Sequence, residues 1–395
     1  MRSFGSSSFK ERTTVTGKAL NRPLKILHID PEKNWGGGES QVLGLLSYLA
    51  ARGHGIHLLA HPEGRLFQRS QEQSIRTMPL IVRNDFDLRP VFRLRRLIRE
   101  ENYDIVHLHT KRAHVLSLWL WRGLATPKYV VTRRMDYPEA NTWYTRYLYN
   151  RKVDGVVAIS CKISTLLIEA GVEREKIRLI HSGIDPKPFE TAAKIRDVHP
   201  DRVVVGMVAV LEERKGHRFL LEAAGRLKAQ GYQIHYCVAG EGSLRKSLQK
   251  AATRLGVKDE VQFQGFVSDM PAFLSQVDIL VLPSLFEGFG VSVLEAMAAG
   301  KAVIASRVGG LEELVSDSVT GLLVAPRDVD GLARAIAKLA GDRKLLREMG
   351  RKGRARLQAN FTIERMAEQN EDYYYGLLET NGQMSHVPNT HVTSA

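Results

Sequence analysis

The chain has 395 residues, 44% of them hydrophobic and 25% charged, and a formal net charge of +14 at pH 7. This length favours two domains, the composition is that of an ordinary folded protein, and no stretch approaches the roughly 20 apolar residues of a membrane-spanning helix. The two cysteines, Cys161 and Cys237, exclude a disulfide framework and fit a reducing cytosol.

The basic charge is concentrated in the first half of the chain. Residues 1–23 are rich in serine and basic residues but lack the apolar segment of a signal peptide, so they predict a disordered leader. The net charge is +8 over residues 24–190 but only +2 over 191–395. A basic half favours an anionic partner: nucleic acid, anionic lipid or a phosphorylated substrate. We expect no nucleic acid, because no helix-turn-helix, RRM or zinc-finger pattern occurs.

The first half alternates between apolar runs of strand length and helical patterns. This alternation predicts an α/β fold with a doubly wound, mostly parallel sheet. The predicted strands are Leu24–Ile29, Gly55–Ala60, Ile75–Leu80, Asp104–His109, Tyr129–Thr132, Gly155–Ile159 and Lys176–His181.

Glycines follow the first predicted strand. Gly36, Gly37 and Gly38 open the next helix, and a strand, a glycine loop and a helix in this order are typical of a phosphate-binding turn. The spacing matches neither the dinucleotide fingerprint nor the P-loop, and the glycines could instead serve only a tight turn. A second candidate is His109, at the strand end where open α/β sheets bind ligands; His107 alternates with it, and a structural role is as compatible as a functional one.

Two basic and apolar stretches follow. Residues 89–99 carry five arginines around an apolar helical stripe, and residues 119–152 interleave tryptophan and tyrosine with basic residues. The first stretch is either a helix with a solvated arginine face or an interfacial helix that binds an anionic membrane.

The second half begins after a polar connection with prolines at positions 186, 188 and 200. A second α/β unit is predicted, with Lys215 and Gly216 in the loop after its first strand and with Lys301–Ala305 closing its sheet. Its predicted strands are Arg202–Val210, Gln233–Ala239, Val261–Gln264, Ile279–Leu282 and Lys301–Ala305.

The stretch Pro283–Gly300 is the most informative. A turn with Gly288 and Gly290 around Phe289 joins a buried strand to an apolar helix, so free backbone N–H groups and the positive end of the helix dipole meet where a phosphate could bind. Glu287 lies on this turn and Glu295 two helical turns further on. They are placed to reach two parts of one elongated ligand.

This stretch closely resembles the E-x7-E signature of retaining nucleotide-sugar glycosyltransferases of family 4, which have the GT-B fold of two Rossmann-like domains facing each other across a cleft. The resemblance covers about residues 24–378. It implies an acceptor-side domain at 24–185, a linker at 186–200, a donor domain at 201–360, a helix at 361–380 that crosses back to the first domain, and a disordered tail at 381–395.

The resemblance also implies roles for individual residues. Lys215 matches the family lysine that binds the donor diphosphate, whereas the family arginine is absent and Arg214 is its candidate substitute. Glu287 would bind the donor sugar and Glu295 the ribose. The other residues assigned to the donor are Gly37, Gly38, Phe289, Gly290, Val291 and Val267. On the acceptor side, Arg134 stands where many relatives have a histidine, which suggests an anionic acceptor group; His109 is a second candidate there, and Asp136 has an open role.

No metal or other cofactor is expected. The D-x-D patterns Asp85–Asp87 and Asp328–Asp330 precede helices, where acidic residues act as caps. The resemblance therefore implies an enzyme that transfers a hexose from a UDP- or GDP-sugar to a glycan or lipid-linked acceptor in cell-envelope or lipopolysaccharide synthesis. We expect it in the cytoplasm, peripheral to the inner face of the membrane. The alternatives are another GT-B enzyme, such as a nucleotide-sugar epimerase, and more remotely a nucleic-acid-binding protein.

Overall fold

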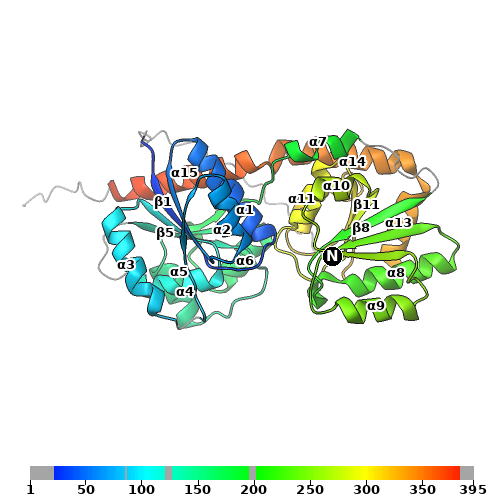
Figure 1. The fold of residues 1–395 in the computed structure, drawn as a ribbon, viewed down its shortest axis with the longest axis horizontal. Coiled ribbons are helices and arrows are strands. Elements are labelled where there is room, and N and C mark those ends of the chain that lie inside the picture. The colour runs from blue at the N-terminus through cyan, green and yellow to red at the C-terminus, as the bar shows by residue number, and fades with distance from the viewer. Residues whose placement is uncertain (1–21, 85–86, 121–126, 195–201, 383–395) are drawn as a thin grey trace, which may run out of the picture.

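The computed structural model describes residues 22–84, 87–120, 127–194 and 202–382 and shows two α/β units side by side (Figure 1). Each unit is built on a parallel sheet, which confirms the predicted doubly wound class. Most of the predicted leader and tail, and Asp85 of the first D-x-D pattern, lie outside the described residues.

The first sheet has seven strands in the order β3-β2-β1-β4-β5-β6-β7, and every neighbouring pair is parallel. Its strands are β1 Lys25–Asp30, β2 Gly55–Ala60, β3 Arg76–Pro79, β4 Ile105–Leu108, β5 Lys128–Arg133, β6 Gly155–Ala158 and β7 Ile177–Leu179. Its helices are α1 Gly37–Ala51, α2 Arg65–Glu72, α3 Arg89–Glu101, α4 Lys111–Leu120, α5 Trp143–Arg151 and α6 Cys161–Glu169.

The second sheet has six strands in the order β10-β9-β8-β11-β12-β13. Its strands are β8 Val203–Val208, β9 Ile234–Ala239, β10 Val261–Gly265, β11 Ile279–Leu282, β12 Ala302–Ser306 and β13 Leu322–Val324. Its helices are α7 Glu190–Lys194, α8 His217–Ala229, α9 Arg245–Arg254, α10 Met270–Ser275, α11 Val291–Ala298, α12 Leu311–Leu314 and α13 Val329–Gly341.

One prediction about this second unit is wrong, and one connection has more structure than its sequence indicates. The sheet does not close at Lys301–Ala305, because β13 pairs with the outer side of β12; with three residues, β13 is too short to give a strand pattern. The connection after Pro186 is not simply polar. It contains a 3-10 turn, Lys187–Phe189, and then α7, and the buried Phe189 and Ala192 hold it against the protein while α7 packs on α10.

The last two helices return the chain to the first unit. α14 (Arg343–Asn360) packs on α11, and α15 (Ile363–Gly382) packs along α1, as Figure 1 shows. A Cβ on Gly44 of α1 would lie 2.4 Å from Ile363 Cδ1, so a side chain at position 44 would have to displace the Ile363 side chain. The chain therefore passes between the two units twice.

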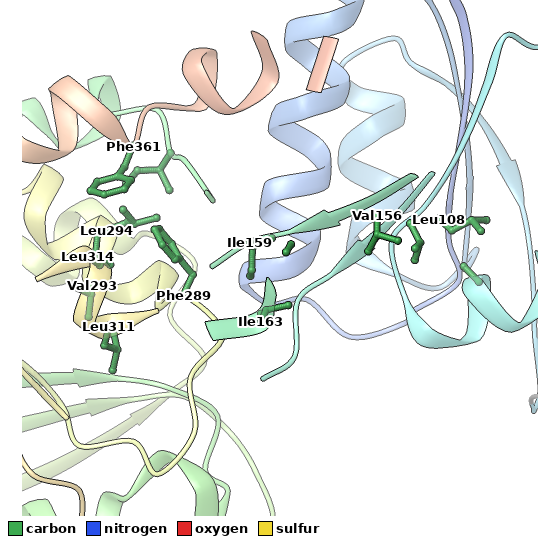
Figure 2. Packing of buried hydrophobic residues seen from close by; sticks show 14 of the residues in the cluster. Leu108, Val156, Ile159, Ile163, Phe289, Val293, Leu294, Leu311, Leu314 and Phe361 are labelled. Atoms are coloured by element: carbon green, nitrogen blue, oxygen red, sulfur yellow. The ribbon is translucent and has the colours of Figure 1, made fainter. Parts of the chain in front are cut away.

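Both crossings meet at one point. Ile184 and Thr362 form a parallel β-bridge, and the Gln41 side-chain amide bonds both the N–H and the carbonyl of Gly183. One apolar core then continues across the junction. In Figure 2, Phe289, Leu311 and Phe361 lie on one side and Ile159 and Ile163 on the other. The two units are thus packed together as well as covalently joined.

Membrane-spanning helices are not found among the described residues, since none of their helices combines the length and the apolar character that crossing a bilayer requires.

Candidate active site

The loops at the carboxyl ends of β8 and β11 bring Lys215 and Glu287 together. Lys215 ends a 3-10 turn (Glu213–Lys215) after β8, and its Nζ lies 2.5 Å from Glu287 Oε2. Ser284 Oγ donates to the same oxygen at 3.3 Å. Both charged side chains are nearly buried, with 12% and 11% exposed, so this is a largely desolvated ion pair.

The backbone holds these two loops in register. The N–H of Leu285 donates to the carbonyl of Arg214 at 2.7 Å. Gly216 has a φ of +74°, and a Cβ there would lie 1.9 Å from the Pro283 carbonyl oxygen. A side chain at position 216 would therefore be both strained and blocked, which explains the glycine after the lysine.

The loop after β11 also receives contacts from the first unit. Asp136 Oδ2 accepts a hydrogen bond of 2.8 Å from the N–H of Glu287. A Cβ on Gly288 would lie 2.1 Å from the carbonyl oxygen of Arg134, and a Cβ on Gly37 would lie 2.8 Å from Val291 Cγ2. The residues predicted on the two sides of a cleft thus meet, with backbone against backbone.

Helix α11 begins at this meeting point. Its N-cap is Gly290, with a φ of +93°, and no side chain caps its first turn. The N-terminus of α1 approaches through Gly37, although the Glu39 carboxylate already accepts the N–H of Gly36 at 2.7 Å. The first turn of α11 is therefore the better-suited anion site of the two.

Glu295 lies on the next turns of α11, with its carboxylate available. This carboxylate makes no hydrogen bond or ion pair with another residue in the part of the chain that the structure describes. Burial raises the pKa of Glu295 to about 7. A desolvated carboxyl without a protein partner suits a ligand that donates hydrogen bonds.

Three other predicted donor residues differ in their surroundings. The Phe289 side chain is 2% exposed and packs between His181 and Phe361, so only its backbone can face a ligand. A donor contact by Phe289 stays a prediction and would use its backbone, because the interdomain core takes the ring. Val267 is partly buried against this same core. Arg214 pairs with Glu212 at 2.8 Å and not with Glu287.

On the first unit, Arg134 lies in a cluster of buried charges. Burial lowers the pKa of Arg134, while Asp30 and Glu39 act in the opposite direction. Burial, followed by the charge of Glu39, raises the pKa of Asp30 to about 7. Arg134 Nε is buried and has no hydrogen-bond partner among the described residues, and Gly38 approaches the Arg134 side chain. Because two carboxyls accompany the single guanidinium, the cluster has no net positive charge, contrary to what Arg134 suggests by itself.

Behind this cluster lie three buried histidines. His109 Nε2 lies 2.9 Å from His28 Nδ1, and His107 contacts the Tyr374 hydroxyl at 2.5 Å and Thr132 Oγ1 at 2.6 Å. Burial lowers the pKa of His109 well below its usual value, so the ring is neutral at pH 7. Since both nitrogens of His107 are occupied, the trio is poorly suited to a metal. The sequence analysis missed His28 and Asp30, although they stand at the end of a strand, the signal that pointed to His109.

The described aspartates of the D-x-D patterns have protein partners. Asp87 pairs with Arg89, Asp328 caps α13 by accepting the N–H of Gly331, and Asp330 pairs with Arg226. In the described residues, these carboxylates are therefore used for helix starts and ion pairs.

Comparisons with known proteins agree with this arrangement. The sequence model described as Glycosyltransferase Family 4 matches residues 35–187, and that described as Glycosyl transferases group 1 matches residues 189–356. The chain is 30% identical over 350 residues to the lipopolysaccharide core biosynthesis glycosyltransferase LpsE of Rhizobium meliloti (strain 1021), covering 87% of this chain and 97% of that protein. It is 25% identical over 393 residues to the Escherichia coli UDP-Gal:alpha-D-GlcNAc-diphosphoundecaprenol alpha-1,3-galactosyltransferase, covering 91% and 99%.

The fold is shared with solved structures. Anabaena Alr3699/HepE, solved in complex with UDP and glucose, superposes with a TM-score of 0.78 at 22% identity, covering 89% of this chain and all of that one. The GT-B arrangement of two Rossmann-like units is thereby confirmed.

Proposed function

Since the chain belongs to the glycosyltransferases of family 4 (group 1), we propose that it transfers a hexose, with retention of anomeric configuration, from a UDP- or GDP-sugar to a lipid-linked glycan. Two relatives support this choice of substrates. One is named for lipopolysaccharide core biosynthesis, and the other for transfer of galactose from UDP-Gal to a diphosphoundecaprenol-linked sugar.

The single observation that carries the proposal is the Lys215–Glu287 pair at the uncapped N-terminus of α11. When the bond between sugar and diphosphate breaks, negative charge grows on phosphate oxygens and positive charge on the sugar ring. An ammonium and preorganised N–H groups stabilise the first, and a carboxylate the second. Losing one such group typically costs about 10²–10³ in kcat.

The donor roles are divided between the two glutamates. Glu287 holds Lys215 in place and accepts hydrogen bonds from hydroxyls of the transferred sugar, while Glu295 accepts from the ribose. We assign no enzymic nucleophile: the acceptor hydroxyl attacks on the face from which the diphosphate leaves. Because Lys215 and the α11 N-terminus neutralise the diphosphate, no divalent ion is required.

The acceptor hydroxyl approaches from the first unit, near Asp136 and the Asp30–Arg134 cluster. Arg134 Nε, buried without a partner among the described residues, is available for an acceptor oxygen. The neighbouring carboxyls favour a hydroxyl there over a phosphate, so the anionic part of the acceptor binds elsewhere.

The test is a panel of UDP- and GDP-sugars, screened by calorimetry and followed by product analysis with a radiolabelled donor. One nucleotide should bind, and label should move to an added lipid-linked glycan, with retained configuration by NMR. If the label instead stays on the nucleotide, in an epimer of the donor sugar, the protein is an epimerase and not a transferase. An inverted product would refute retention alone.

Because a lipid-linked acceptor is held in a membrane, we propose that the outer face of α3, α4 and α5 docks on the anionic inner face of the cell membrane. These helices pack side by side on the first unit (Figure 1). Phe92 is 77% and Trp143 73% exposed, and Trp119, Tyr144 and Tyr147 are exposed beside them. On α3, Val91, Leu94 and Ile98 are core residues, so the prediction of an apolar interfacial stripe survives only for Phe92.

Basic groups surround these aromatic residues. Arg93 and Arg99 are exposed on α3. At the end of α5, the exposed Arg151 borders a hollow of about 540 Å³ next to Tyr147. Since each basic residue near an anionic surface contributes about 1 kcal/mol, the surface supports reversible, salt-sensitive binding.

Sedimentation with anionic and with neutral vesicles, at low and high salt, tests this docking. Binding should require anionic lipid and should weaken in high salt. Trp143→Ser should reduce it severalfold, whereas Tyr232→Ser, which removes an exposed aromatic residue from the second unit, should not. Equal binding to both vesicle types, or none to either, would refute membrane docking and leave the transferase assignment intact.

A further inference from the structure

Three metal-binding side chains meet at the junction of the two units, beside the proposed reaction site. Cys161 is the first residue of α6, His181 follows β7, and Glu313 lies on α12. One ligand atom from each lies within 4.8 Å of the other two. The proposed transfer reaction uses none of them.

We propose that Cys161, His181 and Glu313 bind Zn²⁺ and thereby clamp the two units together. Thiolate, imidazole and carboxylate are the three side-chain ligands that zinc takes in proteins, and three of them leave one position for water. The thiolate disfavours Mg²⁺ and Ca²⁺, which prefer oxygen ligands. Cys161 is exposed, so an ion can reach the site from solvent.

Only small movements are needed. Zinc bonds of about 2.0–2.1 Å to nitrogen and oxygen and about 2.3 Å to sulfur, in a tetrahedron, put the ligand atoms about 3.3–3.6 Å apart. His181 Nε2 and Glu313 Oε2 are now 2.9 Å apart and must separate by a few tenths of an ångström. The thiol must approach by about 1 Å at most, which a side-chain rotation of Cys161 supplies.

The surroundings already orient two ligands. Both carboxylate oxygens of Glu313 accept the N–H of Cys161, Oε1 at 2.8 Å and Oε2 at 3.0 Å, and Oε2 also lies 2.9 Å from His181 Nε2, so the carboxylate is held between the other two ligands. The His181 ring stacks on Phe289 with centroids 5.0 Å apart and meets Phe361 edge-on. Removing the groups that orient a metal ligand typically lowers metal affinity about 10–100-fold.

The clamp follows from where the ligands come from. Cys161 and His181 belong to the first unit and Glu313 to the second, while His181 packs on Phe289 of the loop that carries Glu287. An ion bound to all three resists separation of the units, so it slows exchange of donor and product. This slowing rests on the proposed function, whereas the binding of the ion does not.

Titration of the metal-free, full-length protein with Co²⁺ tests the site directly. One equivalent should give a thiolate-to-Co²⁺ charge-transfer band, and Zn²⁺ should abolish it by displacement. The band should be absent in Cys161→Ser and unchanged in Cys237→Ser, the matched control at the other cysteine. His181→Gln should weaken Co²⁺ binding by at least about 10–100-fold while its Cys161 stays reactive to a thiol reagent.

Two further measurements test the clamp. Zn²⁺ should raise the melting temperature of the wild type and of Cys237→Ser but not of Cys161→Ser, and it should inhibit turnover with the same pattern. Because zinc binds the thiolate, binding releases the thiol proton and should become tighter as pH rises.

The possible outcomes are distinct. A band that persists in Cys161→Ser, or no band in the wild type, overturns the site. A Cys161-dependent band with no effect of Zn²⁺ on melting overturns the clamp. Loss of transferase activity in every protein, with the band present, would instead count against the proposed function.

Discussion

Glu287→Gln separates the two tasks that we assign to the Lys215–Glu287 pair, which are binding of the diphosphate by Lys215 and stabilisation of the positive sugar by Glu287. The substitution keeps the size of the side chain and an oxygen that can accept from Lys215, but it removes the negative charge. The two atoms are 2.5 Å apart, and both side chains are nearly buried. The change is therefore confined to the charge at the centre of the site.

The stability effect should be moderate. A hydrogen bond to a charged group contributes about 1.5–3 kcal/mol, and a neutral one about 0.5–1.5 kcal/mol, so about 1–2 kcal/mol should be lost. For a domain of this size, that corresponds to a fall of about 2–8 °C in melting temperature. The protein should remain folded at assay temperature.

The catalytic effect should be much larger. Without its charge, residue 287 no longer compensates the positive sugar in the transition state, and kcat should fall about 10²–10³-fold. The Kd for free UDP or GDP should stay within about threefold, because Lys215 keeps its charge and loses a competing carboxylate. Steady-state kinetics and calorimetry on the same preparation measure the two effects.

Glu260→Gln is the matched control. It alters the Lys228–Glu260 pair, whose atoms are 2.6 Å apart and which lies outside the site, and it should leave kcat unchanged. Nucleotide affinity that falls more than about tenfold in Glu287→Gln, in step with kcat, would contradict the division of tasks. A fall in kcat of less than about tenfold would show that the charge of Glu287 does not act in the transition state.

Four further outcomes are expected. Glu295→Ala should weaken binding of the free nucleoside diphosphate more than it lowers kcat; the same pattern as in Glu287→Gln would contradict the assigned roles. Since burial raises the pKa of Glu295 to about 7, its carboxylate is lost as pH falls through 7, so nucleotide affinity should decline from pH 8 to 6 more steeply in the wild type than in Glu295→Gln. Activity should survive EDTA. Complete loss of activity, restored by Mn²⁺ or Mg²⁺, would instead indicate a metal site at Asp85–Asp87. In Gly288→Ala, the new Cβ would lie 2.1 Å from the Arg134 carbonyl oxygen, so this variant should hold the units apart and lower kcat about 10²-fold with nucleotide affinity retained. The control Gly341→Ala, which has open space at its Cβ, should be neutral. Equal kinetics in the two variants would show that the close approach is not needed.

Local sequence patterns predicted the sheets and the positions of the main charged residues, but not the contacts between them. Ile279–Leu282 is apolar throughout because β11 is covered on both faces, and such a run is visible without a structure. Lys215 and Glu287 were each identified from their loops. Their contact, across 72 residues of chain, depends on the packing of two βα units and leaves no local signal.

The surroundings of Phe289 and Phe92 were not predicted, because they too depend on contacts with distant segments or on the side of the helix that faces the core. Phe289 stands between two glycines in a loop, which suggested a ligand contact, but His181 and Phe361 from distant segments cover its ring. Phe92 was grouped with Val91 in an apolar stripe. On a helix, neighbouring residues point about 100° apart, so only Val91 reaches the core and Phe92 is exposed.

The way the two units are joined explains why contacts between the units at the site involve the backbone of the loop after β11. The chain crosses between the units at Ile184 and again at Thr362, and these crossings pair with each other, so we expect any opening of the units to be a rotation about that bridge. Such a rotation separates the N–H of Glu287 from Asp136 and Gly288 from the carbonyl of Arg134. On the proposed function, the donor loop is completed by the acceptor-side unit only when the units are closed. Closure would then fix the geometry of Glu287 and exclude water from the sugar in the same step.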